Sequence, residues 1–240
     1  MYKLSVVLSA LLSLAAAGPI ETRQTGTSSS EFSRSLVCRD ILFAWARGST
    51  EIGNMGTVIG PPLSDGLKNI FGRTNVATEG IDYAALVSTN VLPGGTDLIS
   101  ELRMRNTLED MARRCPNSVI VTGGYSQGAA VNHRAIEDLS QSVKDQIAGT
   151  VLYGDTQRQQ DNGQIPNFPR DKVLIICNTG DAVCNGLLTV LPPHLTYGSR
   201  AAEGYNFLAN KIRGAQAKIK ARNARRALEE AEAEVAALEE

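Results

Sequence analysis

One serine lies at the centre of the sequence Gly-Tyr-Ser-Gln-Gly at residues 124–128, and its surroundings predict a nucleophile. An apolar, β-branched run at residues 118–122 precedes this sequence, and a helix-compatible stretch at residues 129–139 follows it. A serine on such a strand-to-helix turn is typical of the nucleophile elbow of hydrolytic enzymes. Because the turn is tight, glycine is needed two residues to either side, and the Ser126 hydroxyl is left exposed. The alternative is an ordinary loop in which the motif occurs by chance.

A serine hydroxyl needs a base, and histidine is the usual one because its pKa lies near neutrality. The chain contains two histidines, His133 and His194. His133 follows Ser126 by seven residues on the same predicted helix, about 10 Å along its axis, which is beyond hydrogen-bond reach. We interpret His133 as a surface residue of that helix. His194 lies in a late loop, Leu-Pro-Pro-His-Leu, and is the predicted base.

The imidazole of such a base is held in one tautomer by a carboxylate. The chain order of α/β-hydrolases places this acid between the serine and the histidine, where Asp155 and Asp181 compete. Asp155 ends one predicted strand and could be a solvated turn residue. Asp181 follows the next strand inside Cys-Asn-Thr-Gly-Asp-Ala-Val-Cys, where a small disulfide loop would fix its carboxylate. We therefore favour Asp181 as the acid.

The elements that must position these residues alternate along the chain. Strands are predicted at residues 41–46, 75–81, 118–122, 149–153 and 172–178, and helices at residues 61–71, 97–114 and 129–139. Such alternation predicts an α/β domain with a central, mostly parallel sheet and helices on both faces. Active sites of these sheets lie at the carboxyl ends of the strands, where the candidate nucleophile and both candidate acids fall.

Composition limits the classes of function and the kinds of site. The chain has 240 residues, of which 42% are hydrophobic, and a net charge of −1. It can therefore bury a full core, but it has no overall field that would attract nucleic acid. Four cysteines, Cys38, Cys115, Cys177 and Cys184, fit disulfides better than zinc, because Cys-x-x-Cys pairs are missing. The six-residue spacer favours pairing Cys177 with Cys184, which leaves Cys38 with Cys115.

The amino-terminal end is typical of a secreted protein. Residues 1–17 have the cationic start, apolar stretch and alanine-rich end of a signal peptide, and the apolar stretch is too short to span a bilayer. Residues 18–36 have the composition of a disordered pro-segment or an N-terminal arm, with a candidate cleavage site after Arg23. The expected location is therefore extracellular, without a membrane span.

Together these motifs resemble the fungal cutinases. The resemblance rests on the serine elbow, the Cys-Asn-Thr-Gly-Asp-x-Val-Cys loop, Pro-His-Leu-x-Tyr-Gly at residues 193–198 and Ala-Arg-Gly-Ser-Thr at residues 46–50, and it spans roughly residues 38–213. It implies a compact α/β-hydrolase with no large lid at residues 37–214, and it supports both disulfide pairs. It also implies an ester substrate, polymeric or soluble, and no cofactor or metal.

The resemblance further implies the roles of individual residues. It implies the triad Ser126, Asp181 and His194, the oxyanion-hole donors Ser49 and Gln127, and Asn90 as the residue that orients the Ser49 hydroxyl. From the residues themselves, the Gln127 amide at the start of the helix can face an oxyanion beside the serine. Apolar side chains near the base predict a crevice for acyl chains, formed by Leu86, Val87, Leu187, Leu188, Val190, Leu191 and Leu195 with Tyr125 at its border. Burial of about half of these in the core is the alternative.

We therefore predict a secreted serine esterase that hydrolyses cutin-like polyesters and short-chain soluble esters through an acyl-enzyme. An acetylxylan esterase of related fold is the nearest alternative, but it would need a polar carbohydrate cleft, whereas the loop before His194 is rich in leucine. A more distant alternative is a non-catalytic surface-binding protein that retains the fold.

The carboxyl-terminal tail, residues 215–240, is not explained by the resemblance. Apolar residues recur there at alternating spacings of four and three, the pattern of a coiled-coil seam: Ala217, Ala221, Ala224, Leu228, Ala231, Val235 and Leu238. A basic half precedes an acidic half, so two antiparallel copies would place opposite charges together. A solvated single helix is the alternative, because an alanine-rich seam buries little area. We expect a monomer with at most weak self-association through the tail.

Overall fold

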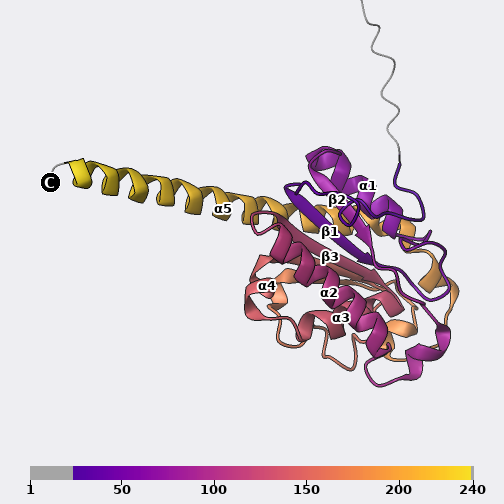
Figure 1. Ribbon diagram of the computed structural model, residues 1–240. Coiled ribbons are helices and arrows are strands. Elements are labelled where there is room, and N and C mark those ends of the chain that lie inside the picture. The colour runs from indigo at the N-terminus through magenta and orange to yellow at the C-terminus, as the bar shows by residue number, and fades with distance from the viewer. Residues whose placement is uncertain (1–23, 239–240) are drawn as a thin grey trace, which may run out of the picture.

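Five parallel strands form one sheet in the order β2-β1-β3-β4-β5, and helices cover both of its faces (Figure 1). The computed structural model describes residues 24–238, with side chains up to residue 234. Within that range the strands are β1 (Ile41–Ala46), β2 (Val76–Gly80), β3 (Val119–Tyr125), β4 (Ile147–Tyr153) and β5 (Val173–Ile176). The predicted α/β architecture is confirmed, and every strand pair in this sheet is parallel.

Four of the five helices in the described range pack as two pairs, one on each face of the sheet. The five helices are α1 (Gly60–Phe71), α2 (Leu98–Arg114), α3 (Gln127–Glu137), α4 (Gln141–Gln146) and α5 (Ala201–Leu238). α1 and the first part of α5 lie together on one face, while α2 and α3 lie together on the other (Figure 1). The short α4 lies on the same face as α2. α2 begins as predicted, because the Asp97 carboxylate accepts a hydrogen bond from the Ser100 N–H.

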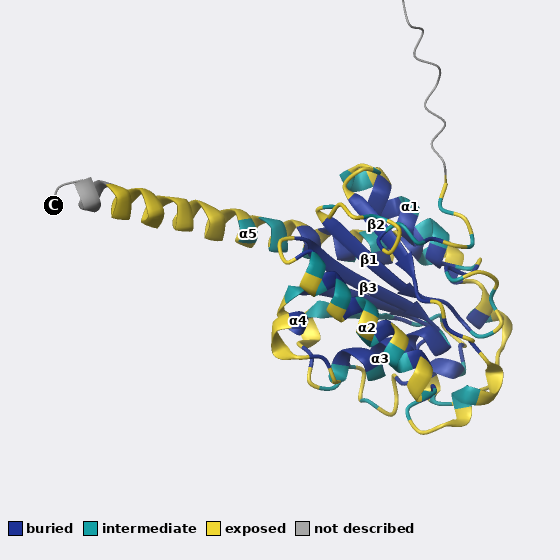
Figure 2. Ribbon diagram, viewed as in Figure 1, coloured by how far each residue is buried: buried dark blue, intermediate teal, exposed yellow. Residues whose placement is uncertain are grey.

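The core has two halves, because side chains alternate across the sheet. Along β1, Ile41, Phe43 and Trp45 pack toward α1 and α5, whereas Leu42 and Ala44 pack toward α2 and α3. Figure 2 shows the strands buried between the two helical layers. Covering of both faces explains why the β1 sequence is apolar at every position rather than at every second one.

An N-terminal arm, residues 24–36, runs beside the edge strand β2. The Glu31 N–H donates to the Thr78 carbonyl at 3.0 Å, and the Phe32 side chain is buried. The arm therefore covers part of an edge that would otherwise expose unpaired backbone groups. The predicted signal peptide lies outside the described residues.

The first residues of the tail still contact the body, because Ala215 and Ile219 pack against the core, and beyond them α5 continues away as a projecting helix (Figure 1). Its residues 221–234 are all exposed, and Leu228 of the predicted seam is 60% exposed. Ion pairs Arg225–Glu229 and Arg226–Glu230 lie along its surface, each at 2.9 Å. This segment is helical, as predicted. Among the described residues, no helix is both long and apolar enough to cross a bilayer.

Two disulfides restrain the ends of these elements, and both predicted pairs are confirmed. Cys38–Cys115 joins the chain before β1 to the end of α2, with the two Cα atoms 5.6 Å apart. Cys177–Cys184 closes the loop that follows β5, with the two Cα atoms 6.2 Å apart.

The two bridges should contribute differently to stability. Cys38→Ser/Cys115→Ser should lower the free energy of unfolding by about 3 to 5 kcal/mol, because this bridge spans 77 residues and restricts the unfolded chain most. Cys177→Ser/Cys184→Ser spans 7 residues and should cost about 2 to 3 kcal/mol. Urea unfolding followed by the fluorescence of the single tryptophan, Trp45, measures both. A larger loss from the short loop would contradict the entropic account.

Candidate active site

Ser126 occupies the turn between β3 and α3, with β3 ending one residue before it and α3 beginning one residue after it. Its φ of 54° and ψ of −119° are uncommon for a residue with a side chain. A Cβ at Gly124 would lie 2.2 Å from the Gly128 carbonyl oxygen, and one at Gly128 would lie 2.0 Å from the Ala46 carbonyl oxygen. Both flanking glycines are therefore required by close backbone approaches, as the elbow motif predicts.

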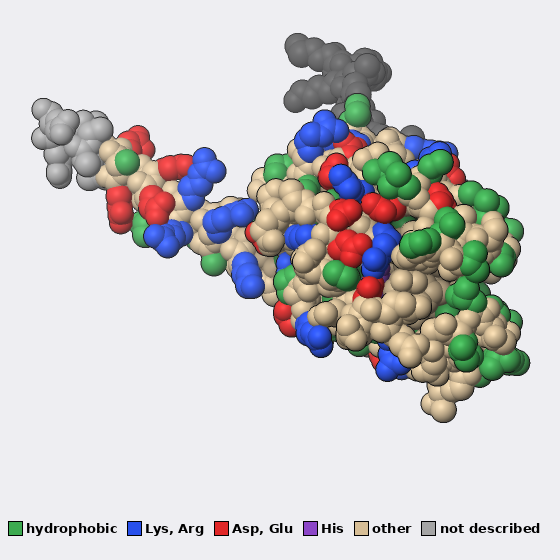
Figure 3. All heavy atoms as spheres, turned by 90° about the horizontal axis from the view of Figure 1, so that it is seen from below, with side chains coloured by type: hydrophobic (Ala, Val, Ile, Leu, Met, Phe, Trp, Pro, Cys, Tyr) green, Lys and Arg blue, Asp and Glu red, His purple; other side chains and the backbone are tan. Residues whose placement is uncertain are grey.

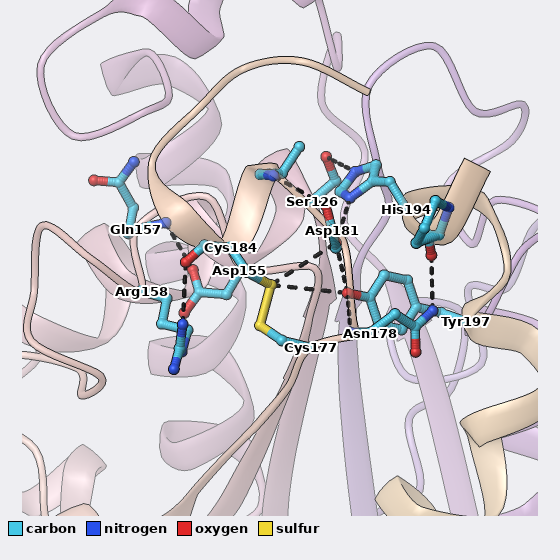
Figure 4. Close-up of a disulfide and its surroundings, with 12 residues drawn as sticks. Ser126, Asp155, Gln157, Arg158, Cys177, Asn178, Asp181, Cys184, His194 and Tyr197 are labelled. Carbon is cyan, nitrogen blue, oxygen red and sulfur yellow. Dashed lines mark hydrogen bonds and ion pairs between the residues drawn. A yellow bond between two sulfur atoms is a disulfide. The ribbon is translucent and has the colours of Figure 1, made fainter. Parts of the chain in front are cut away.

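Three side chains from separate segments meet at the carboxyl end of the sheet (Figure 4). Nε2 of His194 lies 2.9 Å from Oγ of Ser126, and Nδ1 of His194 lies 2.8 Å from Oδ2 of Asp181. His194 and Asp181 are each 2% exposed. In this arrangement the imidazole can take the serine proton while the carboxylate holds its tautomer, which is the chemistry of an activated serine nucleophile.

The His194 ring is held by close contacts. The Tyr125 ring stacks on it with centroids 5.2 Å apart, and the Tyr125 hydroxyl donates to the His194 carbonyl at 2.7 Å. Gly154 also packs against the ring, because a Cβ at that position would lie 2.7 Å from Cε1 of His194. The orientation of the imidazole is therefore fixed by an aromatic face and by backbone.

The Asp181 carboxylate has a further partner that sequence reasoning missed. Its Oδ1 accepts from the Val183 N–H at 3.0 Å, and the buried Tyr197 hydroxyl donates to its Oδ2 at 2.6 Å. The same hydroxyl accepts from the Asn178 N–H at 2.9 Å. Burial raises the pKa of Tyr197, as does the hydrogen bond to Asp181, so it remains a donor. The available signal was the tyrosine three residues after the base.

The expected oxyanion-hole residues lie beside the nucleophile. Nδ2 of Asn90 donates to Oγ of Ser49 at 2.9 Å, and both residues line the same cavity as Ser126. The Gln127 side chain donates to the Leu86 carbonyl at 2.8 Å. Because Leu86 directly precedes the 3₁₀ turn η1 (Val87–Val91), this hydrogen bond ties the start of α3 to that turn. The Gln127 backbone N–H belongs to the first turn of α3, where no intrahelical acceptor is available.

A cavity of about 420 Å³ opens beside these residues. Its apolar lining comes from Val87, Val91, Val183, Leu188, Val190 and Leu195, and Tyr125 and Thr156 also contribute. Four predicted rim residues and Tyr125 are therefore in the lining, whereas Leu86, Leu187 and Leu191 are not. The predicted rim side chains other than Tyr125 are all exposed, so placing half of them in the core was wrong. Figure 3 shows hydrophobic side chains gathered at the end of the body opposite the tail.

Two other interpretations from the sequence are wrong. His133 is not a surface residue and Asp155 is not a solvated turn residue, since both are fully buried. They contact each other, with Nε2 of His133 3.0 Å from Oδ2 of Asp155. Of the two candidate acids, Asp181 is therefore the one that contacts His194. Among the described residues, no group of three His, Cys, Asp or Glu side chains could hold a metal ion.

The chain matches known proteins over most of its length. The family profile described as Cutinase matches residues 37–212. Cutinase CUT2 of Pyricularia oryzae is 44% identical over 213 residues, which cover 88% of this chain and 99% of that protein. A solved Trichoderma reesei cutinase in complex with a phosphonate inhibitor has a TM-score of 0.69 at 31% identity, covering 78% of this chain and 80% of that one.

The fold is shared more widely than the sequence. The catalytic core domain of an acetyl xylan esterase from Trichoderma reesei superposes with a TM-score of 0.56 at 15% identity, covering 73% of this chain and 100% of that one. At this identity the likeness shows the fold alone.

Tyr197→Phe should test the support of Asp181. Removing a hydroxyl that donates to a buried carboxylate should lower kcat/KM for an activated ester about tenfold, since hydrogen bonds to charged groups contribute about 1.5 to 3 kcal/mol. Tyr205→Phe, a half-buried tyrosine of α5, is the matched control and should leave the rate unchanged. Equal rates for both variants would contradict a role of Tyr197 at the acid.

Proposed function

The chain belongs to the cutinase family, and on this premise we propose that it is a secreted serine esterase that hydrolyses cutin-like polyesters and short-chain soluble esters. The observation that carries the proposal is the continuous hydrogen-bonded series from Ser126 through His194 to Asp181. Its position beside an open apolar cavity supports an ester with an apolar acyl part.

Acylation begins at Ser126. Its Oγ attacks the ester carbonyl while Nε2 of His194 takes the hydroxyl proton, and the carbonyl π electrons move to the oxygen. Asp181 accepts from Nδ1–H and stabilises the imidazolium that forms. When the tetrahedral intermediate collapses, the alcohol leaves with the proton from Nε2, and the acyl group remains on the serine.

Deacylation repeats these steps with water as the nucleophile. His194 takes a proton from water, and the acid leaves as Ser126 recovers its proton. In both halves the backbone N–H groups of Ser49 and Gln127 hold the oxyanion, and Asn90 keeps the Ser49 hydroxyl in place. Donors that are fixed before the reaction matter because loss of one typically costs about 10² to 10³ in kcat.

The apolar rim favours cutin-like esters over acetylated carbohydrate. Val87 and Leu195, which line the cavity from separate segments of the chain, are 62% and 58% exposed, and such exposed apolar side chains mark contact with apolar partners. A carbohydrate esterase would instead need polar groups that pair with sugar hydroxyls. An extracellular location is supported by the two disulfides, which persist in oxidising compartments, together with the signal-like residues 1–17.

A substrate panel with an inactive control tests this proposal. The purified protein should hydrolyse p-nitrophenyl butyrate and release monomers from cutin, and it should release acetate from acetylated xylan far more slowly. Ser126→Ala, His194→Ala and Asp181→Asn should each lower kcat by a factor of about 10³ or more while the protein stays folded. Activity should also fall on acidification, because the base must be neutral. Preferential release of acetate, or full activity in Ser126→Ala, would contradict the proposal.

We further propose that residues 215–240 give weak, salt-sensitive self-association on which activity does not depend. The projecting part of α5 supports this, since its basic residues precede its acidic ones and Leu228 is exposed. Within one helix, Arg225 before Glu229 is the weaker order for a pair four residues apart. An antiparallel copy would offer each half an opposite charge.

Sedimentation of the full chain and of a chain ending at Gly214 tests the tail. At low salt we expect a concentration-dependent increase in sedimentation coefficient for the full chain only, and we expect high salt to remove it, because screening weakens exposed ion pairs. The two proteins should have equal kcat on p-nitrophenyl butyrate. Monomeric behaviour of both at every concentration would refute self-association.

A further inference from the structure

A second histidine–carboxylate cluster lies behind the active site and takes no part in the mechanism above. His133 of α3 is fully buried, with Nε2 3.0 Å from Oδ2 of Asp155 and Nδ1 2.6 Å from Oδ2 of Asp161. Arg134 pairs with the same oxygen of Asp161, and its other terminal nitrogen lies 3.0 Å from Glu137. The cluster therefore joins α3 to the loop that follows β4, residues 154–164.

The partners of His133 decide its charge. An ionised carboxylate can only accept hydrogen bonds, so a ring nitrogen that faces one must donate, and a ring with two N–H groups is an imidazolium. The second oxygen of Asp155 is also occupied, because it accepts from the Gln157 N–H at 2.8 Å. Burial alone would lower the pKa of His133, but the charges and hydrogen bonds of Asp155 and Asp161 outweigh burial and raise that pKa to about 9.

The residues on either side of Asp155, Gly154 and Thr156, both reach the active site. Gly154 packs against the catalytic imidazole so closely that a Cβ would lie 2.7 Å from Cε1 and 2.9 Å from Nδ1 of His194. Thr156 lines the substrate cavity. A shift of Asp155 would therefore move the surface on which the base rests. The contact from His133 to Asp155 holds that surface at a fixed distance from the nucleophile helix.

The same loop also reaches the segment that carries the acid. Nη1 of Arg158 donates to the Cys184 carbonyl at 3.3 Å, within the disulfide loop (Figure 4). The Gln159 side chain fills the space beside Gly186, where a Cβ would lie 2.2 Å from Oε1. The loop then returns to α3 through Asp161. His133 thus ties the helix of the nucleophile to a loop that touches both the base and the acid segment.

We propose that His133 is a positioning residue for the ester hydrolysis proposed above. As an imidazolium, His133 keeps Gly154 against the His194 ring and so sets the alkaline limit of activity. This inference rests on the proposed esterase function. When the proton is lost, one buried ring nitrogen faces a carboxylate with no hydrogen between them. The nitrogen lone pair and the carboxylate then repel each other, and a buried carboxylate has lost a hydrogen-bond donor, although Asp161 keeps Arg134 and Asp155 keeps the Gln157 N–H. The loop therefore shifts and the base loses its support.

Other ionisable groups near the cluster do not give the same limit. The charged groups that face it are Asp155 and Asp161 of the loop, Arg134 and Glu137 of α3, and Glu101 of α2. Burial raises the pKa of both glutamates, but from an ordinary value near 4.3, and arginine stays protonated throughout. Tyr125 and Tyr197 contact the base, yet burial raises the pKa of each above its usual range.

The first test uses the wild-type chain. It has two histidines, and a phosphonate on Ser126 perturbs the ring of His194, which assigns the ring C–H signals in NMR spectra. We expect the His133 signal to shift with pH around a midpoint near pH 9. We also expect kcat on p-nitrophenyl butyrate, calculated per active site as counted with the phosphonate, to fall reversibly with the same midpoint. Titration of His133 at or below pH 7, or a constant kcat up to pH 10, would overturn the proposal.

Variants then test the direction of the effect. Asp155→Asn removes a carboxylate that stabilises the imidazolium, so the alkaline midpoint should move down by about one pH unit or more. His133→Gln removes the titrating group and should lower kcat about tenfold at pH 7.5, with KM changed less than about twofold and the alkaline limb lost. Glu137→Gln is the matched control, since Glu137 pairs with Arg134 on the same helix. Its profile should stay close to that of the wild type.

The outcomes separate this inference from the function on which it rests. If the phosphonate labels every variant and their pH profiles superimpose on the wild type, the positioning role is refuted and the esterase stands. If the wild-type chain is not labelled and does not hydrolyse the ester, the proposed function fails and the positioning role fails with it. Should Asp155→Asn or His133→Gln not fold, the wild-type titration decides alone.

Discussion

The backbone turn at Ser126 is the constraint on which the rest of the structure depends. A residue with a side chain at φ 54° and ψ −119° is strained, by about 1 to 3 kcal/mol in typical cases. The turn persists because β3 is paired on both sides and α3 packs on the sheet. The backbone at Gly128 comes so close to the carbonyl of Ala46 that a methyl group would not fit. Core packing therefore keeps the nucleophile in a half-buried, strained position that lines the cavity.

Parallel topology explains why residues from distant segments meet at this turn. In a parallel sheet all strands end at one edge, so the segments after β3, β4 and β5 must lie side by side there. Loops that meet in this way need restraint before they can hold a fixed geometry. Here the restraint is covalent at Cys177–Cys184 and polar at the Tyr197 hydroxyl, which fixes the Asp181 carboxylate. The proposed catalytic groups are thus arranged before any substrate binds.

The sequence predicted correctly those features that depend on residues close together in the chain. Strand–serine–helix order, the apolar strands and the short disulfide spacing all depend on neighbours in sequence, and these predictions agree with the structure. The sequence did not predict the environments of side chains that are created by contacts between distant segments. The sequence predicted His133 as a surface residue of its helix, but the loop after β4 packs over α3 and buries it. Likewise, the Tyr197 hydroxyl reaches Asp181 only because the chain folds back after β5.

The two histidines show how partners, rather than residue type, set the charge of a side chain. His194 has a carboxylate at one nitrogen and a hydroxyl at the other, and since a hydroxyl can donate, the neutral imidazole is fully hydrogen-bonded. His133 has a carboxylate at each nitrogen, so it is fully hydrogen-bonded only as a cation. Residues 154–155 connect the two, because Gly154 touches one ring and Asp155 binds the other. A fixed cation behind the site can therefore support a neutral base in front of it.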